Sequence, residues 1–118
     1  MRAGSFGRGL AAAACLLLVA LAAPRAVAAD GPEETLRTLY RIALSAEMCG
    51  FPIAPRQAEA LGKSMNRALA ESGLDGDAAD QLYRDVDGAL SGEGWETVCE
   101  QNGPWARTYR ALLAANTK

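Results

Sequence analysis

The 118-residue chain contains no histidine. A serine, cysteine or aspartate mechanism that needs an imidazole base is therefore excluded, and so are most zinc, copper and haem sites. β-Branched residues are scarce and no stretch alternates polar and apolar residues, which argues against a β-sheet protein. We accordingly expect a protein that is not an enzyme and that holds no metal and no cofactor.

Long apolar runs are also missing, except for one near the N-terminus at residues 10–23. Two arginines precede this run and small residues follow it at 27–29, so residues 1–29 have the three parts of a cleaved export signal. The alternative is an uncleaved membrane anchor, but fourteen apolar residues are few for a bilayer span. We therefore predict export and signal cleavage before Asp30.

The predicted mature chain, residues 30–118, is long enough for one small domain. It holds all fourteen acidic residues but nine of the twelve basic ones, which gives it a formal charge of −5. Nucleic acids and anionic membranes attract clusters of lysine and arginine. We expect neither as a partner, and we expect no membrane span after cleavage.

Cysteine is rare, with three residues in the whole chain, and Cys15 lies inside the predicted signal. Cys49 and Cys99 remain in the mature chain, and two cysteines in an oxidising compartment favour a disulfide. Closing a loop of fifty residues stabilises a fold by roughly 4 kcal/mol in the chain-entropy model. An exchangeable redox pair is the alternative, but such pairs usually lie two residues apart. Export and the disulfide together predict a periplasmic or secreted protein.

Apolar residues recur at three- and four-residue spacing along most of the mature chain, which is typical of amphipathic helices. Prolines that suit the first turn of a helix and glycines that suit its end divide the pattern. We expect helices over about 32–49, 55–72, 77–90 and 95–101, and a last one from 104. The apolar faces include Ala58 in the second helix and Ala89 in the third. The predicted fold is all-α, a small bundle of four to five short helices held by one disulfide.

Large aromatic side chains are the best candidates for a binding surface. They are Phe51, Trp95, Trp105 and Tyr109. In so small a domain such residues usually form the core, but tryptophan and tyrosine also commonly anchor protein interfaces. Both interpretations stay open at the level of sequence.

Acidic residues offer two further candidates, and neither is supported by its spacing. Two runs of aspartates, one from Asp75 and one from Asp85, can be compared with the calcium loop of an EF-hand. In both, alanine stands where the loop needs an oxygen ligand, and a residue other than glycine stands where the loop needs glycine. Glu47 and Glu100 each neighbour a cysteine, but nothing in the sequence fixes their separation for acid–base work. We interpret the aspartates as helix caps and a solvated face.

The export signal, the mature length, the helical pattern and the spacing of Cys49 and Cys99 together resemble the small periplasmic acid-stress chaperones of the HdeA type. The resemblance is one of architecture. It implies that acid would neutralise the carboxylates, leave nine basic side chains repelling one another, and expose apolar surface to unfolding clients while the disulfide limits expansion.

The sequence favours a non-enzymatic exported protein that acts by binding another periplasmic protein, as an inhibitor, an accessory subunit or an envelope-stress factor. The first alternative is the acid-activated chaperone that the resemblance implies. The second is a carrier of a small molecule or metal, with a pocket between the helices.

Overall fold

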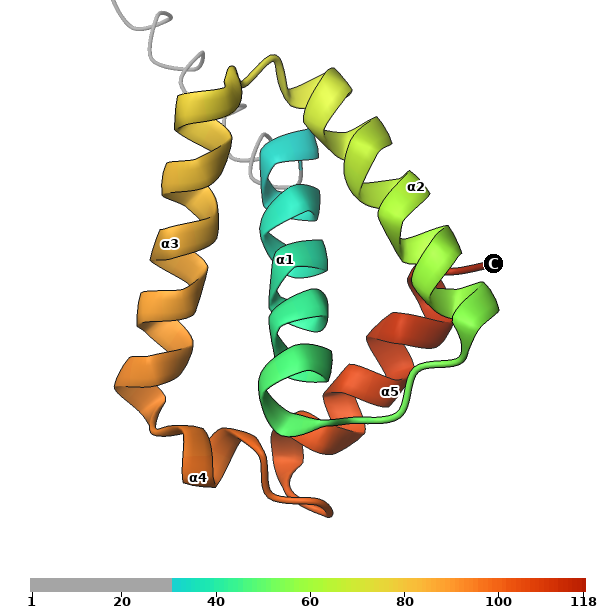
Figure 1. Ribbon diagram of the computed structural model, residues 1–118, viewed down its shortest axis with the longest axis vertical. Coiled ribbons are helices and arrows are strands. Elements are labelled where there is room, and N and C mark those ends of the chain that lie inside the picture. Colours follow the sequence, from blue (N-terminus) through green and yellow to red (C-terminus); the bar gives the residue numbers. More distant parts are fainter. Residues whose placement is uncertain (1–30) are drawn as a thin grey trace, which may run out of the picture.

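The computed structural model describes residues 31–118, which form five helices and no strand (Figure 1). The helices are α1 (Pro32–Cys49), α2 (Pro55–Ser72), α3 (Gly76–Glu93), α4 (Trp95–Val98) and α5 (Pro104–Asn116). The prediction of a small all-α bundle is confirmed. The expected export signal lies outside the described residues, and none of the described helices has the length and apolarity needed to cross a membrane.

Helix α1 is the centre of the bundle, because it packs against each of the other four helices. Figure 1 shows α2 and α3 on opposite sides of α1, joined by a turn at one end of the molecule. Helix α5 crosses the other end of α1, and the short α4 connects this region to α3. The chain therefore wraps its first helix with the four that follow.

Local sequence sets most of the helix ends. Prolines occupy the first position of α1, α2 and α5, where a missing N–H costs nothing. Gly50 ends α1 in the left-handed conformation, with φ of 67°, and donates its N–H to the Ala46 carbonyl over 3.1 Å. Asp75 caps α3, since its side chain accepts a hydrogen bond from the Ala78 N–H at 2.8 Å. These predicted boundaries are confirmed.

The buried apolar side chains form two clusters. The larger cluster comes mainly from α1, α2 and α5 and consists of Leu36, Leu39, Ile42, Phe51, Leu61, Ala68, Leu82, Ala106, Tyr109 and Leu113. The smaller cluster comes from α1, α3 and α4 and consists of Leu44, Val86, Leu90 and Val98. Both clusters contact α1, so this helix is buried on several faces and not along a single stripe.

Three details differ from the sequence prediction. Helix α4 ends at Val98 instead of continuing to residue 101, so Cys99 lies just after it. Helix α3 continues into the expected break and ends only at Glu93, followed by Gly94 with φ of 94°. Ala58 and Ala89 were expected on buried faces but are exposed, because α2 and α3 each contact the bundle along a narrow strip.

Candidate functional site

Two of the four candidate aromatics lie in the core. Phe51 and Tyr109 are 4% and 1% exposed, and their ring centroids lie 5.0 Å apart. The Tyr109 hydroxyl donates to the Pro52 carbonyl over 3.1 Å, and burial raises the pKa of this tyrosine above its ordinary value. This pair therefore fastens the α1–α2 link to α5 and offers no surface to a partner.

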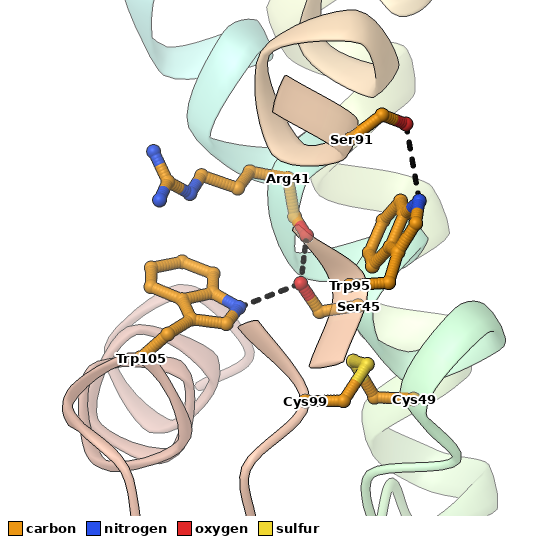
Figure 2. The surroundings of a disulfide bond; sticks show 7 residues. All are labelled: Arg41, Ser45, Cys49, Ser91, Trp95, Cys99 and Trp105. Atoms are coloured by element: carbon orange, nitrogen blue, oxygen red, sulfur yellow. Dashed lines mark hydrogen bonds between the residues drawn. A yellow bond between two sulfur atoms is a disulfide. The ribbon is translucent and has the colours of Figure 1, made fainter. Parts of the chain in front are cut away.

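Trp105 is half-buried at the start of α5 and is held by a serine of α1 (Figure 2). Its indole N–H donates to the Ser45 hydroxyl over 2.7 Å, and that hydroxyl donates to the Arg41 carbonyl over 2.8 Å. Ser45 is fully buried, so both hydrogen bonds are shielded from water. The orientation of the indole is consequently fixed by the fold.

The side chain of Arg41 lies over one face of this indole. Its guanidinium carbon is 4.2 Å from the centre of the Trp105 ring, a cation–π distance. Its terminal nitrogen is 3.4 Å from a carboxylate oxygen of Glu93, so the arginine also links α1 to α3. Its Nε is buried and has no hydrogen-bond partner among the described residues.

These residues surround a groove where α1, α3, α4 and α5 meet. We call it the Trp105 groove. Its volume is about 270 Å³, and it is lined by Arg41, Glu93, Thr97, Val98, Pro104, Trp105 and Thr108. The groove therefore combines an aromatic ring, an aliphatic side chain, a proline and one paired arginine.

The predicted disulfide is present and helps to fix this region. Cys49 at the end of α1 is bonded to Cys99 just after α4, and the two Cα atoms lie 5.0 Å apart. Residues 97 and 98 of the groove come directly before Cys99 in the chain. The covalent link thus holds one wall of the Trp105 groove against the helix that carries Arg41.

Trp95, the other half-buried tryptophan, lies on the opposite side of Ser45 in Figure 2. Its indole N–H donates to the Ser91 hydroxyl over 3.0 Å, and its ring packs against the smaller cluster. It does not line the Trp105 groove. The two tryptophans therefore belong to separate parts of the surface.

Sequence reasoning missed Arg41, Ser45 and Glu93. The only available signal was general: a half-buried tryptophan needs an acceptor for its N–H, and small hydroxyl residues commonly provide one. The serine that does so lies sixty positions earlier in the chain. Helical periodicity reports which residues share a face, but it does not report which helices meet.

The structure gives the acidic candidates no buried site. Glu47 and Glu100 are exposed, and the side chain of Asp75 is used as a helix cap. Within residues 31–118, no three side chains of histidine, cysteine, aspartate or glutamate are grouped so that they could hold a metal ion.

Two other grooves adjoin one another beside α2 and the end of α5. Their volumes are about 340 and 370 Å³, and they share Ala60, Lys63 and Lys118. The 340 Å³ groove has Leu39 and Ala68 among its lining residues, with polar and charged side chains around them. The tryptophans contribute to neither groove.

No protein-family model, no curated protein sequence and no solved structure matches the chain.

Proposed function

We propose that this is a small exported, non-enzymatic helical protein that acts in the periplasm or outside the cell by binding another protein. The Trp105 groove receives a side chain of that partner. The observation that carries the proposal is the half-buried Trp105 with Arg41 stacked on its face, at the edge of a groove of about 270 Å³.

The residue types at this groove support a protein partner. Tryptophan and arginine are strongly enriched among residues that contribute most of the binding energy of interfaces. The ring presents apolar area with little conformational freedom left to lose, because Ser45 already fixes it. The disulfide keeps the opposite wall in place before binding. A preorganised groove of this kind suits an apolar or aromatic side chain of the partner.

The proposal is tested by filling the groove from its rim. Thr108→Arg places a long side chain at an exposed lining position, and Ala58→Arg places the same side chain on the exposed face of α2 as a control. Partners are captured from an envelope extract with the wild-type protein, and their affinity is then measured by calorimetry with purified components. We expect Thr108→Arg to weaken binding at least tenfold and Ala58→Arg to leave it unchanged. Equal affinities for the two variants, or no specific partner, would refute the proposal.

A second candidate function, acid-activated holding of unfolded clients, is favoured by one contact. The Arg41–Glu93 ion pair joins two helices, whereas the other three ion pairs described within 31–118 lie inside single helices. Acid weakens the ion pairs of carboxylates in general, while the disulfide would keep the end of α1 joined to the residue after α4. Dye binding and suppression of client aggregation at pH 2–3 test this function. A closed domain without client binding under these conditions would rule it out.

A further inference from the structure

Charge is distributed unevenly over the described helices. Residues 75–100, which include α3 and α4, contain eight acidic side chains and one basic one, a net charge of −7. Residues 104–118, which include α5, contain three basic side chains and no acidic one, a net charge of +3. The overall acidity of the mature chain therefore hides one strongly acidic and one basic region.

The charges of these two regions are not neutralised within the molecule. Among residues 31–118, the ion pairs are Glu33–Arg37, Glu34–Arg37, Arg41–Glu93 and Glu59–Lys63. None includes a basic residue of α5, and Glu93 is the one member from the acidic region. Both regions thus carry solvent-exposed charge that can attract another molecule.

The basic charge lies along one exposed stripe of α5, which we call the α5 face. Its residues recur at helical spacing and are Arg107, Arg110, Ala111 and Ala114, all of them exposed. The alanines beside the arginines leave room for another helix to approach the backbone.

Helix α3 has a corresponding exposed stripe, which we call the α3 face. It consists of Asp77, Gln81, Arg84, Asp85, Gly88 and Gly92. Arg84 donates a hydrogen bond to Gln81, which donates one to Asp85, and two carboxylates against one guanidinium leave the face acidic. A Cβ atom built on either glycine would meet nothing within 4 Å, so the packing of this domain does not require glycine there. Glycine inside a helix is destabilising, and here it gives a smooth surface beside the acidic residues.

We propose that the α5 face of one molecule binds the α3 face of a second copy of this chain. The two faces carry opposite charge, and each has small residues in its C-terminal half. Figure 1 shows α3 and α5 on different sides of α1, so one molecule can offer both faces at the same time. The association is therefore head-to-tail and can extend beyond two copies.

This contact is electrostatic and hence sensitive to salt. The mature chain as a whole carries −5, which repels a second copy at long range. At contact, the facing stripes lie within the screening length of about 8 Å at physiological ionic strength, so their attraction dominates locally. We expect association that is strongest in low salt.

Sedimentation velocity of the protein purified after export, in about 20 mM and about 500 mM salt, tests the proposal against the screening length. We expect concentration-dependent association in the low-salt buffer and monomers in the high-salt buffer. Two reversal variants, Arg107→Glu/Arg110→Glu and Asp77→Lys/Asp85→Lys, should each weaken self-association at least tenfold. Mixed in equal amounts, they should form a complex, because each restores the charge that the other lacks.

The matched control is Glu59→Lys/Glu71→Lys on α2, which changes the net charge as much as the α3 reversal does and leaves both faces intact. It should associate at least as well as the wild-type protein. Circular dichroism checks that each variant keeps its helicity. Monomers at every concentration in low salt, association that survives either reversal, or a mixture that stays monomeric would overturn the proposal. These results do not depend on the partner of the Trp105 groove.

Discussion

Ten buried side chains form the larger cluster, which joins α1 to α2 and α5, whereas four form the smaller cluster beside α3 and α4. The region with fewer buried side chains has the covalent link and the ion pair between helices. Helix α4 is followed directly by the disulfide, and α3 is linked to α1 by the Arg41–Glu93 ion pair. Apolar burial and hydrogen bonds of α5 thus hold one side of α1, and a disulfide and an ion pair supplement the smaller cluster on the other.

The largest effect should come from removing the covalent link. Cys49→Ser/Cys99→Ser should lower the free energy of unfolding by roughly 4 kcal/mol, since the open chain gains the entropy of a fifty-residue loop. Hydrogen exchange should accelerate in α4 and at the end of α3 more than in α2. Urea unfolding and exchange measured by mass spectrometry check both statements. Uniform acceleration over all helices would contradict the division into two differently stabilised sides.

Matched truncations of leucine compare the two clusters directly. Leu39 and Leu90 are each 1% exposed, one in the larger cluster and one in the smaller. We expect Leu39→Ala to cost about 3 kcal/mol and Leu90→Ala about 2 kcal/mol, because the smaller cluster can relax more easily around the cavity. Chemical denaturation of both variants measures the difference. A larger cost for Leu90→Ala would reverse our ranking of the clusters.

The buried hydrogen bond of Trp105 should have a smaller effect. Ser45→Ala leaves the indole N–H without its acceptor and should destabilise the fold by about 1–2 kcal/mol. Ser64→Ala is the control, because the Ser64 hydroxyl donates to the Asn116 carbonyl at a half-buried site and should matter less. Tryptophan fluorescence during unfolding reports both variants. Equal losses of stability in the two variants would show that the Trp105–Ser45 hydrogen bond contributes no more than the half-buried one of Ser64.

The ionisation of tyrosines should distinguish the two sides of α1, and this effect is confined to high pH. Burial raises the pKa of Tyr40, Tyr83 and Tyr109, and nearby carboxylates raise it further for Tyr40 and Tyr83 alone. A tyrosine whose pKa is higher in the folded state than in the unfolded chain stabilises the fold while it is protonated. This contribution to stability is complete below about pH 10 and is lost as the pH rises through the folded-state pKa. Tyrosinate absorbance in low and high salt, with single Tyr→Phe variants for assignment, measures each pKa.

Added salt should lower the pKa of Tyr40 and Tyr83 towards the ordinary value and leave that of Tyr109 unchanged. Tyr40 and Tyr83 lie between α1 and α3 as an edge-to-face pair with ring centroids 5.2 Å apart. A salt-dependent pKa for Tyr109 would show that charge, and not burial alone, acts on the larger cluster.

Local signals were sufficient to predict the helices. Pro32, Pro55 and Pro104 begin helices as expected, and Gly50 ends one. The prediction was wrong where packing decides: Ala58 and Ala89 were expected on buried faces but are exposed. Ile42, by contrast, is fully buried because α1 is covered on several sides. The Trp105 groove was not predictable as a unit, since its residues come from four helices and meet only after the bundle has assembled.

The position of the disulfide also bears on resistance to proteases. The ring that it closes runs from Cys49 to Cys99 and contains α2, α3 and α4 entirely. One cut at the exposed turn between α2 and α3 would therefore release no fragment, and a nicked molecule would migrate as an intact chain until reductant is added. Such a molecule could keep its shape after damage that would divide an unbridged chain in two.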